Sequence, residues 1–408
     1  MAHEHKVYLE CYFEGKVKMI TCLQVHNDYL IPGGETKSAK LIADLLEKKG
    51  IRVIRYYKDN SVLQNVGATK KIIAGLNSIY SLTTIKEVEE IIKREHVDFA
   101  LIHNTSPIIS NSIYAVLHKH QIKVYKYLQN YNLLCMNGAM DKGEICEQCL
   151  SNSMIGVRQK CYKESKLYTF QKYIAKEMLW EKYIKDIDGF IAISEFVKEK
   201  HVHNGLPLDK VEVLYHFCEK APAVLAKKNE EKYVVYMGRL SKEKGIMTLI
   251  KAMERNQQIN LKILGTGPME NELKQFVANV HISNVHFLGY KTGVEKDEII
   301  GNAIALIAPS EWEEPFGRIV IEAYQVGTPV IASVLGGLKE LVEEGRTGFR
   351  FEAGNVEELE ACISRISSYT EEELYELRRN CVNLVEKKFT EEAYFNNFCS
   401  IMKWENNG

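Results

Sequence analysis

Glu314-Pro-Phe-Gly-Arg-Ile-Val-Ile-Glu322 is the stretch that decides how this chain is interpreted, because seven residues separate its two glutamates. It follows the apolar run 304–309 and opens a helix-like pattern that ends near Gly327. If a helix begins after Pro315, the two carboxylates lie about 12 Å apart along its axis, at ~1.5 Å per residue. That span suits a ligand with two polyhydroxyl ends, such as a nucleotide-sugar. Two solvated glutamates beside a capped helix are the simpler interpretation of this motif alone.

The length and composition of the chain predict a globular protein of two domains. A chain of 408 residues is longer than a domain with a single hydrophobic core usually is. Its 46% hydrophobic and 26% charged residues are ordinary. Residues 1–218 carry 30 Lys and Arg against 25 Asp and Glu, a net +5, and the remainder carries 23 against 29, a net −6. The basic first half favours a peripheral membrane contact, and the nearly neutral whole argues against nucleic acid as a partner.

We expect neither a transmembrane helix nor a signal peptide in this sequence. It has no run of ~18 apolar residues that would cross a membrane. Residues 1–18 lack the apolar segment of a signal peptide and are interpreted as an N-terminal extension. We therefore expect a cytoplasmic protein that works at the inner face of the membrane.

Strand-like and helix-like segments alternate along the chain, which predicts an α/β fold of two doubly wound, Rossmann-like domains. A polar stretch after Cys218 marks the boundary between them. The predicted strands are residues 18–25, 51–57, 99–103, 124–129, 190–194 and 211–217 in the first half, and 233–237, 261–264, 285–288, 304–308 and 329–334 in the second. The predicted divisions are an extension (1–18), a first domain (19–218) with a four-cysteine insertion (135–161), a second domain (219–388) and a final helix (389–408).

Polar turns follow several strands of the second domain, where doubly wound sheets bind their ligands. In the turn after residues 233–237, Gly238 permits close backbone approach, and Arg239 and Lys244 supply two cations beside a helix N-terminus. These features favour a diphosphate, although a similar turn is common on protein surfaces. Gly265 follows the next strand, and the loop at Tyr290 is placed to border a nucleobase.

These turns, followed by E-x7-E, resemble the retaining nucleotide-sugar glycosyltransferases of family 4, which have the GT-B fold. The resemblance covers the chain from about Met19 onward and is strongest over residues 236–351. It implies that the final helix crosses back onto the first domain. It also implies donor-site roles for several residues: Arg239 and Lys244 on the diphosphate, Glu314 on the donor sugar, Glu322 on the ribose, and Phe316, Gly317 and Arg318 along the pyrophosphate and sugar.

The same resemblance implies transfer with retention of anomeric configuration, with departure and attack on one face of the sugar. Protein cations and helix N-termini would neutralise the leaving nucleoside diphosphate, so no metal or other cofactor is expected to be required for catalysis. Asp186-Ile-Asp188 looks like a metal-binding motif of another glycosyltransferase fold, but it precedes its strand. We interpret it as a loop feature.

The acceptor side is predicted from the first domain. Gly33 and Gly34 resemble the glycine loop that faces the donor in this fold, with a plain strand-to-helix turn as the alternative. His26 and His103 stand at predicted strand ends. Gln129 occupies a position that is usually histidine in a subgroup of the family; glutamine forms hydrogen bonds but transfers no proton. The change leaves a positioning role for this residue.

Four of the ten cysteines cluster in the first domain. Cys135, Cys146, Cys149 and Cys161 have the spacing C-x10-C-x2-C-x11-C. A C-x2-C pair flanked by two further cysteines is able to form a structural tetrahedral zinc site, and free thiols are the alternative. Disulfides fit less well in a chain without a secretion signal.

The segment 158–185 interleaves basic residues with aromatic ones. A helix that packs its aromatic side chains on the first domain is the favoured interpretation. Contact with a membrane surface or a lipid acceptor is the alternative.

The sequence therefore predicts a metal-independent glycosyltransferase that moves a sugar from a UDP-, GDP- or ADP-sugar to a glycan or lipid-linked hydroxyl acceptor, in surface polysaccharide assembly. One alternative is an epimerase or hydrolase of the same fold, which would convert the donor without an acceptor. Another is a non-catalytic nucleotide-sugar-binding protein.

Overall fold

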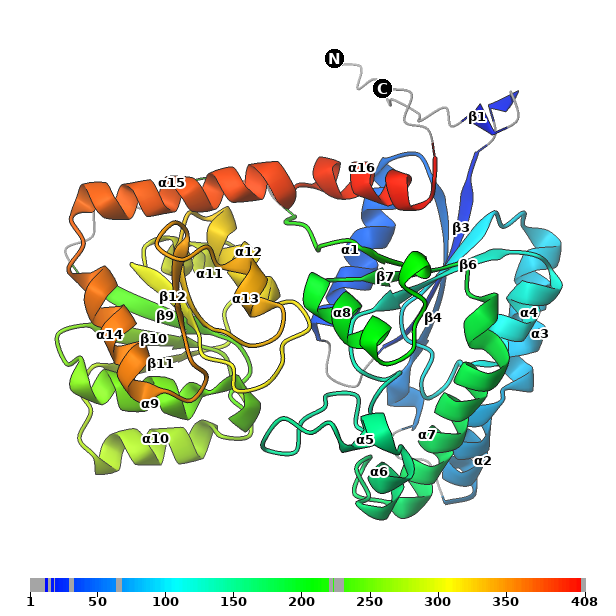
Figure 1. Cartoon of the computed structure of the whole chain (residues 1–408), viewed down its shortest axis with the longest axis horizontal. Helices are drawn as coiled ribbons and strands as arrows, with labels where there is room; N and C mark the ends of the chain where they lie inside the picture. The colour runs from blue at the N-terminus through cyan, green and yellow to red at the C-terminus, as the bar shows by residue number, and fades with distance from the viewer. Residues whose placement is uncertain are drawn as a thin grey trace.

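The computed structural model describes residues 12–13, 16–17, 19–28, 33–63, 68–219, 223 and 231–404. Within them the chain forms two six-stranded parallel sheets, one in each lobe of the molecule (Figure 1). Most of residues 1–18 and the loop 29–32, on which predictions were made, lie outside the described residues. Tyr12–Phe13 (β1) and Lys16–Val17 (β2) pair as a short antiparallel ribbon. The predicted α/β fold of two doubly wound domains is confirmed.

The first sheet has the strand order β4-β3-β5-β6-β7-β8. Its four central strands are almost wholly buried, as expected when helices cover both sides of a parallel sheet, whereas the edge strands β4 and β8 are partly exposed. The last strand is shorter than predicted, because residues 214–217 leave the sheet. The strands are β3 (Thr21–Asp28), β4 (Arg52–Asp59), β5 (Phe99–Ile102), β6 (Lys123–Leu128), β7 (Gly189–Ala192) and β8 (Val211–Val213).

The second sheet has the order β11-β10-β9-β12-β13-β14. Its first five strands match predicted ones to within one or two residues, and the predicted domain boundary lies between β8 and β9. The sixth, β14, was not predicted, because a four-residue strand gives little periodicity to recognise. The strands are β9 (Tyr233–Met237), β10 (Asn260–Leu264), β11 (Val285–Gly289), β12 (Ala305–Ala308), β13 (Val330–Ser333) and β14 (Gly348–Phe351).

Helices cover both sheets, and several begin at a side-chain cap that satisfies a free backbone N–H. Ser81 caps α3 and Thr370 forms a capping box with Glu373 on α15. The first-domain helices are α1 (Gly34–Lys48), α2 (Ala68–Ile79), α3 (Leu82–Arg94), α4 (Ser112–Lys119), α5 (Gln148–Ser151), α6 (Met154–Arg158), α7 (Lys166–Met178) and α8 (Glu195–His203). The second-domain helices are α9 (Ile246–Arg255), α10 (Glu270–Asn279), α11 (Gly293–Gly301), α12 (Arg318–Gln325), α13 (Leu338–Leu341) and α14 (Val356–Ser367).

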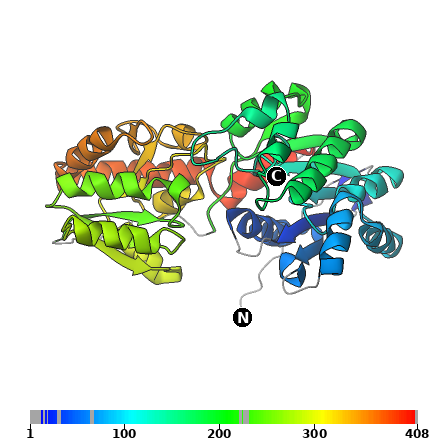
Figure 2. The same cartoon turned by 90° about the horizontal axis from the view of Figure 1, so that it is seen from below.

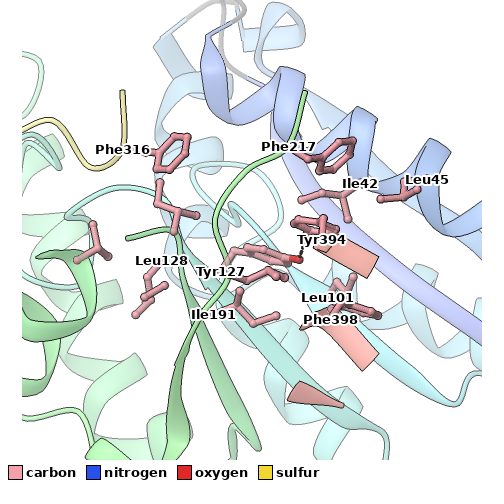
Figure 3. Packing of buried hydrophobic residues seen from close by; sticks show 14 of the residues in the cluster. Ile42, Leu45, Leu101, Tyr127, Leu128, Ile191, Phe217, Phe316, Tyr394 and Phe398 are labelled. Atoms are coloured by element: carbon pink, nitrogen blue, oxygen red, sulfur yellow. Dashed lines mark hydrogen bonds between the residues drawn. The ribbon is translucent and has the colours of Figure 1, made fainter. Parts of the chain in front are cut away.

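The chain ends by crossing back to the first domain, as predicted. Helix α15 (Glu371–Lys388) runs along the second domain, and α16 (Glu391–Ile401) lies against α1 of the first (Figures 1 and 2). The hydroxyl groups of Tyr394 and Tyr127 are 2.6 Å apart, and Tyr394 and Phe398 join the buried core beside Leu101 (Figure 3). Apolar burial of this kind ties the two lobes together.

Polar contacts also join the domains across the cleft. Glu340 of α13 accepts hydrogen bonds from the backbone N–H groups of Glu195 and Phe196, at 3.0 and 3.1 Å. This contact places a carboxylate at the positive N-terminus of α8. Ser194 Oγ donates to the carbonyl of Pro315 at 2.6 Å, and Tyr131 donates to the carbonyl of Glu313 at 2.7 Å. The loop that carries Glu314 is thus held by the first domain.

Within the residues described, no helix is both long enough and apolar enough to cross a membrane.

Candidate functional site

A pocket of about 360 Å³ lies between the domains, at the carboxyl ends of strands from both sheets. This is where doubly wound sheets bind ligands. We call it the donor cleft. Residues of both domains line it: Gly34, Glu35, Gln129, Ile193 and His216 from the first, and 236–239, Lys244, 308–310, Trp312 and 314–319 from the second. The cleft therefore brings the glycine start of α1 opposite the E-x7-E loop.

Glu314 and Lys244 form an ion pair in the donor cleft. Lys244 donates to Glu314 Oε1, and Ser310 Oγ donates to the same oxygen at 2.9 Å. The Lys244 ammonium also lies 4.9 Å from the ring centroid of Trp312, a distance at which an ammonium and an indole attract. These contacts hold the carboxylate and the ammonium in place before any ligand binds.

Two glycines allow the turns of the donor cleft to approach one another backbone to backbone. Gly245 has φ +64°, and a Cβ there would lie 1.8 Å from the Pro309 carbonyl oxygen. At Gly265, a Cβ would lie 1.8 Å from the Gly238 carbonyl oxygen. The first approach sets Lys244 beside Glu314. Gly265 does not line the cleft itself but supports the turn that does.

The E-x7-E segment is not one continuous helix, which corrects the expectation that a helix begins after Pro315. Gly317 has φ +98°, and α12 starts only at Arg318. Glu314 therefore sits in a loop ahead of the helix, and the distance along a helix axis does not apply to the two carboxylates. Phe316, Gly317 and Arg318 all line the cleft, so the N-terminus of α12 faces it with a cation.

Glu322 lies in α12 but is not among the residues that line the cleft. Its carboxylate accepts from Lys296 at 2.9 Å and from Lys37 of the first domain at 3.3 Å. Burial alone would raise its pKa, but Lys296, Lys37 and Arg318 together lower the pKa of Glu322. The contact of Glu322 with a ribose stays a prediction. A bound ribose would share the Glu322 carboxylate with Lys296 and Lys37.

Of the remaining residues predicted to bind the donor, some line the donor cleft and others do not. Gly238 and Arg239 line the cleft, and the Arg239 side chain has no hydrogen bond or ion pair with any residue that the structure describes. Tyr290 is 77% exposed and does not line the cleft. Gly34 lines it, whereas Gly33 stands just outside, at the start of α1. The loop that precedes Gly33 lies outside the described residues.

Gln129 is held by a chain of buried hydrogen bonds. Gln24 Nε2 donates to His103 Nε2 at 2.9 Å, so His103 carries its proton on Nδ1 and donates it to Gln129 Oε1 at 3.1 Å. Burial, assisted by His26, lowers the pKa of His103 to about 3, so the ring is neutral. Gln129 lines the cleft, and its Nε2 has no hydrogen-bond partner among the described residues. The hydrogen bond from His103 therefore fixes the orientation of the Gln129 amide and leaves its Nε2 without a partner among the described residues.

His26 and His103, the two histidines predicted for the acceptor side, are both buried in the first domain. Neither His26 nor His103 lines the donor cleft. His26 lies 3.0 Å from Thr36 Oγ1 and 3.3 Å from an oxygen of Asp28, and burial lowers its pKa. His103 acts on the cleft only through Gln129.

Several residues that line the donor cleft were not predicted. Trp312 lies within two residues of Glu314, and its position in Glu311-Trp-Glu-Glu314 was the available signal. Its indole N–H is buried without a partner among the described residues. His216 packs edge-on against Phe316, with ring centroids 5.1 Å apart. It comes from the segment mistaken for the end of a strand, so nothing local indicated its role.

The four clustered cysteines lie in and around the helices α5 and α6, and all of them are free thiols. The Cys149 thiol donates to Cys135 and lowers the pKa of Cys135. Cys135, Cys149 and Cys161 belong to one small apolar cluster. Among the described residues, however, no group of three or more His, Cys, Asp or Glu side chains is poised to hold a metal ion.

Zinc on these cysteines remains a prediction with a direct test. If Cys135, Cys146, Cys149 and Cys161 form a zinc site, metal analysis of the purified protein finds about one zinc per chain. A stably folded protein without zinc would rule this site out.

The two sheets, the returning α16 and the cleft between the domains define a protein of the GT-B fold. Residues 218–387 match the family "Glycosyl transferases group 1". The similarity to this family covers most of the second domain, which carries Arg239, Lys244, Glu314 and Arg318.

Several individual proteins are similar to this chain. An uncharacterized 42.6 kDa protein in the cps region of Klebsiella pneumoniae is 25% identical over 78% of this chain and 82% of its own length. An uncharacterized glycosyltransferase of Methanocaldococcus jannaschii is 29% identical over 42% of this chain and 45% of its own. The structure of Anabaena HepE in complex with UDP-glucose aligns with a TM-score of 0.65 at 17% identity, over 94% of this chain and 99% of that one.

Proposed function

We propose that this protein is a retaining glycosyltransferase that moves a sugar from a nucleotide-sugar to a hydroxyl acceptor. The main observation behind this proposal is that three basic side chains line the donor cleft. Arg239, Lys244 and Arg318 line one pocket together with the N-terminus of α12. Fixed cations and a helix N-terminus stabilise the charge that develops on a leaving diphosphate.

In this proposal each residue acts on one part of the donor. The diphosphate lies against Arg239, Lys244 and the start of α12. Glu314, held by Lys244 and Ser310, contacts the sugar. The acceptor hydroxyl then attacks the face from which the diphosphate leaves, so the anomeric configuration is retained. Because protein cations neutralise the leaving group, the proposed reaction requires no metal.

Gln129 extends this proposal to the acceptor side of the cleft. Its oriented Nε2 would donate to a sugar hydroxyl, which is the positioning role that glutamine is able to serve without transferring a proton. The relative in the Klebsiella cps region supports a role in surface polysaccharide assembly. We place the protein in the cytoplasm, at the inner face of the membrane, where such acceptors are assembled.

Thermal unfolding with UDP, GDP, ADP and their sugar conjugates, all in EDTA, tests the donor. The nucleotides that carry one of the three bases are expected to raise the unfolding midpoint of the protein. A ligand at 100 times its Kd stabilises the folded state by ~2.7 kcal/mol. An Arg239→Ala variant serves as the control and should lose most of this shift. If no nucleotide shifts the midpoint of the wild-type protein, the donor proposal is wrong.

A further inference from the structure

A second cavity of about 360 Å³ lies entirely within the first domain, between the ends of β5 and β6 and the helices α2 and α7. Figure 1 shows α2 and α7 side by side at the edge of this domain. Four lysines line the cavity, and no aspartate or glutamate does. We call it the lysine cavity; its lysines are Lys126, Lys163, Lys172 and Lys176.

Lys126 is the least compensated of these cations. It lies on β6 and is only 8% exposed. Its ammonium has no hydrogen bond or ion pair with any residue that the structure describes. Burial lowers the pKa of Lys126 to about 8, and Glu35 opposes that shift. A buried, unpartnered cation costs free energy in the empty protein, and an anionic ligand would recover that cost.

The other lysines leave further positive charge at the cavity wall. Lys172 donates to the Asn132 side-chain oxygen at 2.8 Å, and burial lowers its pKa to about 8. Lys163 lies 5.6 Å from the ring centroid of Tyr168. Lys176 is the exception, because Glu177 lies 3.6 Å from it. Three of the four lysines that line the cavity thus have no carboxylate partner among the described residues.

Two hydrogen-bonded pairs connect the lysine cavity to the donor cleft. His103 lines the cavity and donates to Gln129, which lines the cleft. Asn130 lines the cavity and donates to Glu35 of the cleft at 2.9 Å. The end of β6 therefore forms the shared wall. A molecule in the lysine cavity would lie on the acceptor side of the reaction.

We propose that the lysine cavity binds the phosphoryl group of the acceptor, so that the acceptor is a phosphorylated or diphosphorylated molecule whose hydroxyl end reaches the donor cleft. Lysine ammonium groups bind phosphate as point charges, and a site with several lysines and no carboxylate suits the multiple charge of a diphosphate. Tyr162, Tyr168 and Leu179 supply an apolar wall for the part that carries the phosphate. The assignment of this molecule as acceptor rests on the proposed function; the phosphoryl site itself does not.

Titration calorimetry with three probes tests the site: inorganic pyrophosphate, farnesyl diphosphate and N-acetylglucosamine 1-phosphate. The donor cleft is kept saturated with the nucleoside diphosphate that stabilises the protein, or left empty if none does. We expect binding of at least one probe by the wild-type protein, weakened tenfold or more in Lys126→Met. Preference for the prenyl probe identifies a lipid-linked acceptor, and preference for the sugar phosphate identifies a soluble one.

Lys123→Met is the matched control, because Lys123 begins the same strand but is exposed and does not line the cavity. It should bind the probes as the wild-type protein does. Lys126→Met should also raise the unfolding midpoint of the free protein by ~2–4 °C, since it removes a buried charge. A lysine with a purely structural role would lower that midpoint.

Two results would overturn the proposal: no binding of any probe by the wild-type protein, or equal binding by Lys126→Met. Nucleotide titrations on the same samples separate the two hypotheses. Loss of probe binding with intact nucleotide binding would remove the phosphoryl site alone. Absence of nucleotide binding by the wild-type protein, with probe binding that depends on Lys126, would remove the donor function and leave the phosphoryl site.

Discussion

Glu314→Gln is expected to reduce sugar transfer at least about 100-fold, the scale on which a preorganised electrostatic contact acts in a transition state. Glutamine keeps the size of the side chain but removes the negative charge that pairs with Lys244 and that, in the proposed function, contacts the donor sugar. Nucleoside diphosphate binding should persist or strengthen, because Lys244 loses its anionic partner within the cleft. Initial transfer rates and nucleotide titrations on the same preparation measure the two effects separately.

Glu311→Gln provides the control for this loss. Glu311 lies in the same loop and accepts a hydrogen bond from Thr248, but it does not line the donor cleft. Its substitution should leave transfer within about a factor of two, as is usual for positions outside a site. Transfer by Glu314→Gln at the wild-type rate would remove Glu314 from the proposed mechanism.

Gly245→Ala is expected to lower the free energy of unfolding by about 3 kcal/mol, through strain at a position that only glycine fits. The new Cβ would meet the Pro309 carbonyl oxygen at 1.8 Å, and φ +64° is unfavourable for alanine. The turn must then move away from the end of β12, which separates Lys244 from Glu314. Transfer should fall with the unfolding midpoint.

Gly354→Ala isolates the steric part of this effect. Gly354 has a comparable φ of +77°, but nothing lies within 4 Å of the position of its Cβ. It should therefore show only the backbone cost, on the order of 1 kcal/mol, and retain full activity. If Gly245→Ala and Gly354→Ala lost equal stability, the close contact between the new Cβ and the Pro309 carbonyl would have no energetic effect of its own.

Much of the fold was predictable because it depends on local patterns. The apolar runs that became β9 and β12 are buried on both faces, and burial of this kind leaves an unbroken hydrophobic signal. The E-x7-E motif and the turn with Arg239 and Lys244 were also recognisable, because each is a single short stretch of sequence. The short strand β14 gave no such signal, and Gly317, with its positive φ, made α12 begin later than the apolar spacing indicated.

The sequence by itself thus determined two parallel α/β domains and the cations of the donor cleft, and the family resemblance implied the returning helix. Only the tertiary structure decided what those residues touch. It paired Lys244 with Glu314, moved Glu322 out of the cleft into contact with Lys37 and Lys296, and oriented Gln129 through His103. It also gathered the lysine cavity from β6 and α7, which lie some 40 residues apart. Such sites form when segments that are distant in the sequence pack together. No local pattern predicts them, because the burial and the charge state of a side chain depend on all its neighbours in space.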